Sequence, residues 1–160
     1  MKKIIFLGGS ILFIIGVLFA FHFNNQKENV DSTDNLEGER EKMDETLVVN
    51  IEINGVLYPA TLIDNETTRE LLNRLPLVIT MNELNGNEKY YYFDEIFPSH
   101  SSQVGHINSG DIMLYHDDCL VLFYDDLETS YPYTKIGFID NPENLKNVVG
   151  KESIIVHISI

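Results

Sequence analysis

Two apolar runs separated by a pair of aspartates constrain the fold of this chain more than any other feature. The runs are GDIMLYH at residues 110–116 and CLVLFYD at residues 119–125, and Asp117 and Asp118 lie between them. Aspartate is typical of tight turns, because it caps its own backbone and tolerates the left-handed conformation. The segment therefore predicts a pair of strands joined by a turn, and Cys119 is expected to be a small half-buried hydrophobic residue.

Alternating patterns predict further strands on both sides of this pair. Residues 47–53 and 56–63 alternate around Asn54-Gly55, and this dipeptide supplies the two positive-φ positions of a type I′ hairpin turn. The other predicted strands cover residues 76–84, 135–140 and 152–160.

Two short helices are predicted among the strands. Residues 65–76 carry leucines at helical spacing, with Asn65 or Thr67 as the cap and Pro76 as the end of the helix. The second helix lies within residues 141–150 and ends at Gly150.

The remaining stretch, residues 88–110, is aromatic at first and then irregular, and we expect a long ordered loop there. The count is about seven strands and two short helices. Such a count favours a closed or nearly closed β-barrel with helices over its ends.

An apolar stretch near the N-terminus predicts a membrane segment. Residues 4–23 can cross a hydrocarbon core of roughly 30 Å. The best cleavage site, after Ala20, has the large residue Leu18 at −3. We therefore predict that residues 1–23 are an uncleaved signal anchor, with a cleaved signal peptide and secretion as the alternative. The lysines at positions 2 and 3 orient the folded part outside the cytoplasm.

Residues 24–45 are polar and contain no aromatic residue. Such a stretch buries too little apolar area to offset its ordering entropy, so it is predicted to be a flexible spacer. The folded domain then covers residues 46–160.

The charge of the chain excludes one class of partner. The formal net charge is −14, whereas a protein that binds nucleic acid needs clustered Lys and Arg. Small cations or basic peptides suit this chain better. The single cysteine excludes an internal disulfide and a cysteine-cluster zinc site.

Several groups of polar residues contain the residue types found in metal or catalytic sites, but none has the required pattern. Side chains of His116, Asp117 and Asp118 would diverge from one turn, and the acidic residues 125–128 lack the glycine and the alternation of a calcium loop. The serines beside His100 and His106 lie in no Gly-x-Ser-x-Gly elbow. Cys119 has no evident basic neighbour beyond His116. We therefore predict no metal, no cofactor and no catalytic residue.

The tyrosines are more informative. Tyr131 and Tyr133 bracket Pro132, which extends the backbone and holds two amphipathic rings near a barrel rim. With Tyr115 and the tyrosines at 90–92 they could line an aromatic groove for an extended peptide. The alternative is that the rings pack the barrel mouth and expose only their hydroxyl groups.

The strings LPLVITMNELNGNEK at 75–89 and GDIMLYHDDCLVLFYDDLETSYPYTKIGFID at 110–140 resemble the bacterial cyclophilin-like fold family of small domains. The similarity covers essentially all of residues 46–160. It implies a mainly β fold, a closed eight-stranded barrel with two short helices.

The resemblance leaves the activity open. Cyclophilins isomerise X-Pro bonds with an arginine that hydrogen-bonds the prolyl nitrogen. The corresponding region here, LVITMNELNGNEKYYYF, holds no arginine; Arg40 lies in the spacer, and Arg69 and Arg74 lie in the first predicted helix. Lys89 is a possible positive donor, but lysine lacks the planar fork of arginine.

The leading hypothesis is a membrane-anchored or secreted, non-catalytic module that binds a peptide or small molecule. The alternative is a peptidyl-prolyl isomerase with a non-standard site. Segments 85–90 and 130–134 are the first places to look for ligand contacts, because barrels present groups to ligands at loops and strand ends. The candidate ligand-binding residues are Asn87, Glu88, Lys89, Tyr90, Tyr115, Phe123, Tyr131 and Tyr133, with Phe123 or Leu122 as a pocket floor.

Overall fold

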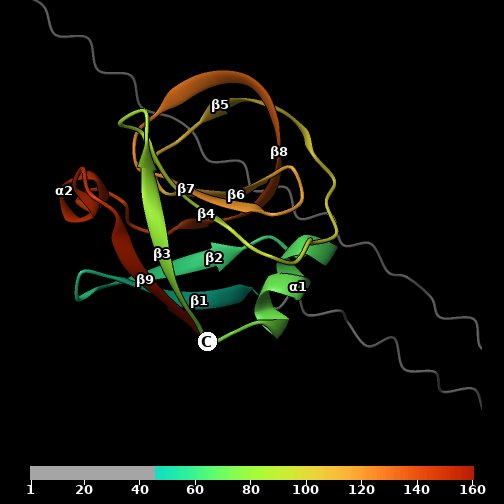
Figure 1. Ribbon diagram of the computed structural model, residues 1–160, viewed down its shortest axis with the longest axis horizontal. Helices are drawn as coiled ribbons and strands as arrows, with labels where there is room; N and C mark the ends of the chain where they lie inside the picture. Colours follow the sequence, from blue (N-terminus) through green and yellow to red (C-terminus); the bar gives the residue numbers. More distant parts are fainter. Residues whose placement is uncertain (1–45) are drawn as a thin grey trace, which may run out of the picture. The chain divides into compact units, whose positions relative to one another are not determined.

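The computed structural model describes residues 46–160 (Figure 1). The predicted anchor at 1–23 and spacer at 24–45 lie outside the described residues. Within 46–160 the chain forms nine strands and two short helices. In chain order these are β1 (Leu47–Ile53), β2 (Val56–Leu62), α1 (Glu66–Asn73), β3 (Leu77–Leu84), β4 (Glu88–Tyr92), β5 (Ser102–Ile107), β6 (Asp111–Tyr115), β7 (Cys119–Phe123), β8 (Leu127–Ile139), α2 (Leu145–Val149) and β9 (Ile154–Ser159).

Eight of these strands close into an antiparallel barrel. The strand order is β2-β1-β9-β3-β4-β7-β6-β8, and pairing of β8 with β2 completes the circle. The predicted eight-stranded barrel is therefore confirmed. The ninth strand, β5, pairs only with the first part of β8, outside the barrel. We call β5 and the paired residues 127–133 of β8 the outer ribbon.

Gly137 allows the barrel to close. It pairs with Leu62 where β8 meets β2. A Cβ atom at this position would lie 2.3 Å from the carbonyl oxygen of Thr61. Because no side chain fits at that distance, the two strands approach each other only with glycine at this point.

The turns follow the sequence pattern with one exception. Asn54 and Gly55 both have positive φ, 51° and 78°, as a type I′ turn requires. Between β6 and β7 the left-handed residue is His116, with φ 55°, and not one of the two aspartates. The turn prediction was right, but the residue expected to take the special conformation was wrong.

The helices cover opposite ends of the barrel. The side chain of Asn65 caps α1 by accepting a hydrogen bond from the Thr68 amide at 2.9 Å, one of the two predicted caps. Helix α1 follows the far end of β2. Helix α2 ends before Gly150 and lies against the β1–β2 turn, where Asn54 donates to the Val148 carbonyl.

Two apolar cores share the strands of the barrel. Along β7 the side chains alternate: Leu120 and Leu122 enter the barrel interior, whereas Val121 and Phe123 enter a second core. This second core lies on the outer face of β4, β7 and β6, beneath the outer ribbon. Because β7 is buried on both faces, its sequence reads as an unbroken apolar run.

The prediction of a long loop at 88–110 was wrong. Residues 88–92 form β4 in the middle of the barrel wall, and residues 102–107 form β5. Only residues 93–101 between these strands are irregular.

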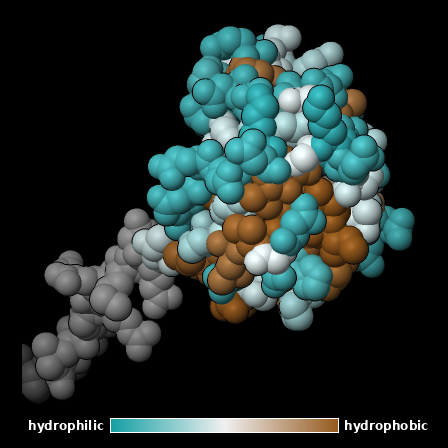
Figure 2. Space-filling model, turned by 90° about the vertical axis from the view of Figure 1, so that its left-hand side faces the viewer, coloured by the Kyte–Doolittle hydropathy of each residue, from teal (hydrophilic) through white to brown (hydrophobic). Residues whose placement is uncertain are grey.

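The surface of the domain carries both apolar and hydrophilic regions. Figure 2 shows apolar side chains gathered on part of one face, next to a hydrophilic region. The exposed apolar residues include Val78 on β3 and Ile155 on β9. Within residues 46–160 neither helix has the length and apolar character needed to cross a membrane.

Candidate functional site

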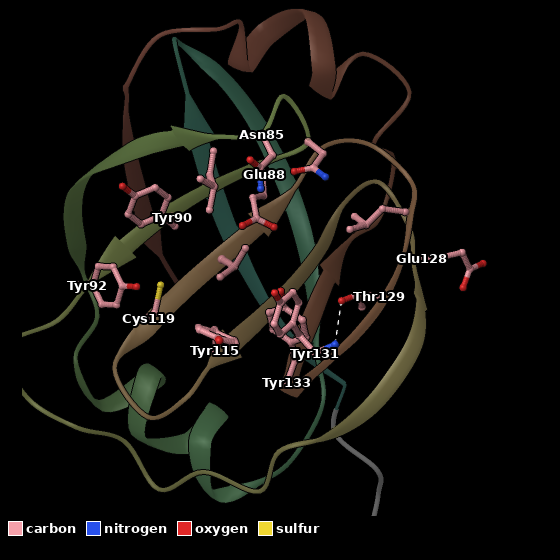
Figure 3. Close-up of a pocket in the computed structure, with 14 residues that line it drawn as sticks. Asn85, Glu88, Tyr90, Tyr92, Tyr115, Cys119, Glu128, Thr129, Tyr131 and Tyr133 are labelled. Atoms are coloured by element: carbon pink, nitrogen blue, oxygen red, sulfur yellow. Dashed lines mark hydrogen bonds between the residues drawn. The ribbon is translucent and has the colours of Figure 1, made fainter.

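A pocket of about 430 Å³ opens into the second core, between the barrel wall and the outer ribbon (Figure 3). We call it the tyrosine pocket, because five tyrosines line it. The other lining residues are apolar, small polar or acidic. The lining residues are Leu84, Asn85, Asn87, Glu88, Tyr90, Tyr92, Tyr115, Cys119, Val121, Leu127, Glu128, Thr129, Tyr131 and Tyr133.

The alternation of strand side chains brings the tyrosines together. Tyr90 and Tyr92 leave the outer side of β4, and their rings meet edge to face with centroids 5.7 Å apart. The ring of Tyr115 on β6 meets those of Tyr131 and Tyr133 on β8, at 6.2 Å and 5.4 Å. Five of the six tyrosines expected to line a groove gather here, on the outer face of the barrel and not at its mouth. The sixth, Tyr91, packs against the core of the barrel beside Phe93.

The tyrosines differ in their access to solvent. Tyr131 and Tyr92 are 61% and 55% exposed and form the rim. Tyr133 is buried, and burial raises the pKa of its hydroxyl to about 12. The part of the pocket wall formed by Tyr133 is therefore aromatic and uncharged at neutral pH.

Glu88 brings an acidic group into this aromatic surrounding. The residue is 9% exposed, and its carboxyl group points into the hollow in Figure 3. No donor among the described residues hydrogen-bonds to this carboxyl group. Burial, and to a smaller extent the nearby charge of Glu83, raise its pKa.

Asn87 contributes a second polar group without a partner. Its side-chain oxygen is buried and accepts no hydrogen bond from any described residue. Buried polar atoms are normally hydrogen-bonded, so each exception needs an explanation. The side-chain oxygen of Asn87 is enclosed by protein atoms, whereas the carboxyl group of Glu88 faces the tyrosine pocket.

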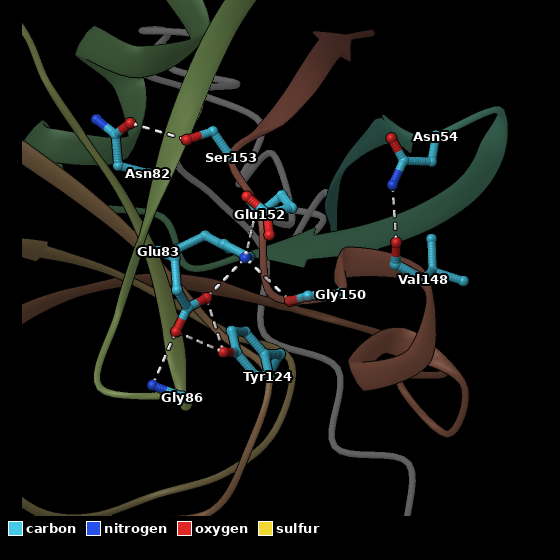
Figure 4. A network of polar contacts seen from close by, with 10 residues as sticks. Asn54, Asn82, Glu83, Gly86, Tyr124, Val148, Gly150, Glu152 and Ser153 are labelled. Atoms are coloured by element: carbon cyan, nitrogen blue, oxygen red, sulfur yellow. Dashed lines mark hydrogen bonds and ion pairs between the residues drawn. The ribbon is translucent and has the colours of Figure 1, made fainter.

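Lys89 lies elsewhere, although it is the next residue in the chain. Because β4 alternates, its side chain enters the opposite side of the sheet, where it is fully buried. Figure 4 shows three residues of this polar network, Glu83, Gly150 and Glu152. Its Nζ donates to the Glu83 carboxylate at 2.6 Å and to the carbonyls of Gly150 and Glu152 at 3.0 and 2.7 Å. Lys89 therefore stabilises one end of the barrel and does not reach the tyrosine pocket.

Phe123 also differs from the prediction. Its side chain is fully buried in the second core, and its ring contacts that of Tyr133 with centroids 5.6 Å apart. Phe123 supports the pocket from behind without lining it. Leu122, the other predicted floor, faces the barrel interior. Of the eight candidates, the structure brings Asn87, Glu88, Tyr90, Tyr115, Tyr131 and Tyr133 to the pocket.

The predicted residues were incomplete. Tyr92, expected among the groove tyrosines, lines the pocket, but so do Cys119 and Val121 of β7, which were not predicted as ligand contacts. The long first part of β8 adds Leu127, Glu128 and Thr129. These three residues carry no sequence signal, because the outer ribbon places them by tertiary pairing.

Cys119 is poorly suited to act as a nucleophile. Burial raises the pKa of its thiol to about 11, so the reactive thiolate is scarce at neutral pH. The side chain is 3% exposed and packs in the second core. The structural role expected for this cysteine agrees with its position.

The two arginines of the described chain are engaged at α1. Arg69 pairs with Asp64, and Arg74 pairs with Glu70 and lies over the Phe97 ring at 3.7 Å. Neither lines the tyrosine pocket. An arginine that could polarise a prolyl nitrogen there is thus absent from residues 46–160.

Within residues 46–160 the histidines and acidic residues do not converge on a common metal site, and several of them form separate pairs. Asp125 pairs with Lys146, His106 with Glu128, and His100 with Glu66, all at exposed positions. In the described part of the chain no three His, Cys, Asp or Glu side chains converge as metal ligands would.

Comparison with known proteins identifies the family of this domain. The model of the Cyclophilin-like family matches residues 51–159, which include all of the barrel except the first residues of β1. The chain belongs to the cyclophilin-like family. A solved structure similar to this cyclophilin-like domain is the solution structure of a hypothetical protein from Archaeoglobus fulgidus, with a TM-score of 0.48 and 20% identity over 71% of this chain and 94% of that one. No curated protein matches the cyclophilin-like chain.

Proposed function

We propose that this cyclophilin-like domain is a non-catalytic binding module whose tyrosine pocket takes a small molecule or one side chain of a peptide. The observation that carries the proposal is the hollow itself. A protein interior is normally close-packed, yet the second core contains a space of about 430 Å³ walled by five tyrosines. Pockets of this size and apolar character, with a few polar groups at fixed positions, are typical of ligand sites.

The lining favours binding over isomerisation. None of the fourteen lining residues is Arg, Lys or His, so the pocket offers no cation to weaken the resonance of a prolyl amide. Lys89, which the sequence suggested as a replacement for the catalytic arginine, donates its hydrogen bonds to Glu83 and two carbonyls on the other side of β4. In this proposal the chain keeps the barrel of the cyclophilins without their isomerase chemistry, because one fold can serve several functions.

The rim indicates how a ligand enters. Tyr131 and Tyr92 are the most exposed of the five tyrosines, and they belong to different strands, β8 and β4. A ligand that passes between them reaches Glu88 and the buried Tyr133. Tyrosine rings of this kind bury a large apolar area while their hydroxyl groups remain available for hydrogen bonds.

A prolyl isomerisation assay separates the two activities. The fragment from Thr46 to Ile160 is assayed without protease, beside a cyclophilin that carries the catalytic arginine, and its folding is checked by its NMR spectrum. We expect no acceleration above the uncatalysed rate. Acceleration proportional to the concentration of the fragment would contradict the proposal.

Binding is tested separately with a ligand-observed NMR screen of small molecules and short peptides. Tyr131→Ala removes an exposed pocket ring and is preferred to Phe123→Ala, which would cost about 3–5 kcal/mol of core packing. The matched control is Phe138→Ala, an exposed aromatic residue of β8 that does not line the pocket. We expect hits that are lost in Tyr131→Ala and retained in Phe138→Ala.

We also propose that residues 4–23 hold this domain outside the cytoplasm as a membrane anchor. The support is the length and apolar character of the segment and the two lysines before it. Protease treatment of intact cells should remove the domain, whereas alkaline washing should leave the full-length chain in the membrane. A chain released by alkaline washing would contradict the anchor.

A further inference from the structure

We propose that the tyrosine pocket binds an organic cation, an ammonium group that carries alkyl substituents, with Glu88 as its counter-ion. This inference rests on the proposed function and names the class of ligand.

Glu88 lacks any compensating group of the protein. Its side chain is nine-tenths buried and points into the hollow, and no described donor contacts it. A buried charge is costly unless it is paired. The neighbouring Lys89 cannot pair with it, because the alternation of β4 directs that ammonium group to Glu83. The position that would neutralise Glu88 therefore lies in the pocket, where a ligand can occupy it.

The surrounding rings suit a cation that is weakly hydrated. The face of a tyrosine ring is negative, and it attracts ammonium groups at distances of up to about 6 Å from its centroid. Tyr90 and Tyr92 lie on the β4 side, and Tyr115, Tyr131 and Tyr133 lie on the opposite side. Methyl groups on the nitrogen would fill the apolar wall between the two sets, while the charge faces Glu88.

Glu88 is the lining carboxylate that faces the hollow. The other acidic lining residue, Glu128, points away from the hollow and pairs with His106. Glu88 is therefore the one lining carboxylate directed at the space between the rings.

Other classes of ligand fit less well. The lining contains two glutamates and no basic residue, which disfavours an anion. A metal ion would need three or more converging ligands, and the described residues provide no such group. A neutral apolar molecule would fill the volume but leave the carboxyl group of Glu88 buried without a partner.

Isothermal titration calorimetry on the full-length chain in maltoside micelles tests the inference. The cationic probes are tetramethylammonium and choline. The neutral control is 3,3-dimethyl-1-butanol, which has the shape of choline without its charge, and 3,3-dimethylbutanoate is the anionic control. We expect choline to bind at least tenfold more tightly than the neutral isostere, and the anion to bind least.

Two glutamate variants make the assignment specific. Glu88→Gln keeps the shape of the side chain and should weaken choline binding by about tenfold to a hundredfold, the range for losing one interaction with a charged group. Binding of the neutral isostere should change by less than threefold. Glu52→Gln is the matched control, because it removes an exposed carboxylate of β1 that does not line the pocket, and it should change choline binding by less than threefold.

The outcomes separate this inference from the proposed function. If the isostere binds as tightly as choline and Glu88→Gln changes neither, the charge is not recognised, and the inference fails while the binding module stands. If no cation binds but another probe of the NMR screen does, the result is the same. If neither the cations nor the screen give binding, both fail.

A last comparison identifies the source of the cation. A tripeptide with trimethyl-lysine at its centre and free choline carry the same ammonium group. Tighter binding of the peptide would assign the group to a protein side chain, and tighter binding of choline to a small molecule. Both results support an organic cation; the absence of binding by both would overturn it.

Discussion

Removing the ammonium group of Lys89 should destabilise the barrel strongly. Its Nζ is fully buried and donates three hydrogen bonds, one to the Glu83 carboxylate and two to backbone carbonyls near the end of α2. Lys89→Met retains most of the stem volume but leaves these acceptors without a donor. Breaking a buried pair by removing one partner costs about 3–5 kcal/mol.

Glu83 connects this pair to the turn after β3. Burial alone would raise its pKa, but hydrogen bonds from Lys89, Tyr124 and the Gly86 amide outweigh burial, and the pKa lies below its usual value. A lowered pKa contributes stability above about pH 4.5 that is lost as the pH falls through the folded-state value. In Lys89→Met this pH dependence should be weaker.

The measurement is urea and thermal unfolding of the fragment from Thr46 at pH 7. For a domain of this size a loss of 3–5 kcal/mol corresponds to a fall in Tm of roughly 12–20 °C. The control is Lys135→Met, which changes an exposed lysine of β8 and should alter stability by less than about 0.5 kcal/mol. A loss of less than 1 kcal/mol in Lys89→Met would refute the reasoning.

Three further predictions follow from positions described above. Gly137→Ala should destabilise the fragment by about 1–3 kcal/mol or prevent its folding, because the new methyl group would meet the Thr61 carbonyl at 2.3 Å; stability within 0.5 kcal/mol of the original would contradict this. Cys119 should react with iodoacetamide at pH 8 about a hundredfold more slowly than a thiol with the usual pKa of 9.0, since burial raises its pKa to about 11, and rapid alkylation of the folded chain would show that the thiol is accessible. Without ligand, Glu88→Gln should be more stable than the unsubstituted chain by about 1 kcal/mol at pH 7 and equal to it near pH 4, because the raised pKa of the Glu88 carboxyl group stabilises the fold below the unfolded-state pKa of 4.5 and this stabilisation is lost as the pH rises. The titratable groups that interact with Glu88 are Glu83, Cys119, Tyr124 and Tyr133. Chemical unfolding of both chains at the two pH values tests the difference.

Most of the barrel could be predicted because its signals are local. The Asn54-Gly55 turn, the Asn65 cap and the apolar runs each specify an element without reference to the rest of the chain. Strands β4 and β5 were missed for opposite reasons. The tyrosine-rich β4 shows no clear alternation of polarity because its first four residues are buried or half-buried on both faces, and β5 is polar and mostly exposed at the edge of the sheet.

The candidate site was predicted less completely, and the errors have one physical cause. Adjacent residues of a strand point to opposite faces, so Glu88 and Lys89 could not both face one pocket. A segment treated as a loop gave no reason to separate them. Once β4 is a strand, Tyr90 and Tyr92 join Glu88, and Lys89 joins the barrel interior. The contribution of residues 127–129 depends on the outer ribbon, which only the tertiary fold defines.

The presence of two cores on opposite faces of the same strands has a consequence for how such proteins can diverge. Substitutions at every second residue of β4, β6 and β7 reach the tyrosine pocket, while the intervening residues keep the barrel packed. The scaffold and the ligand preference can therefore change independently during evolution. A lineage that inherits this barrel can acquire a new ligand through a few outward-facing positions, without a new fold.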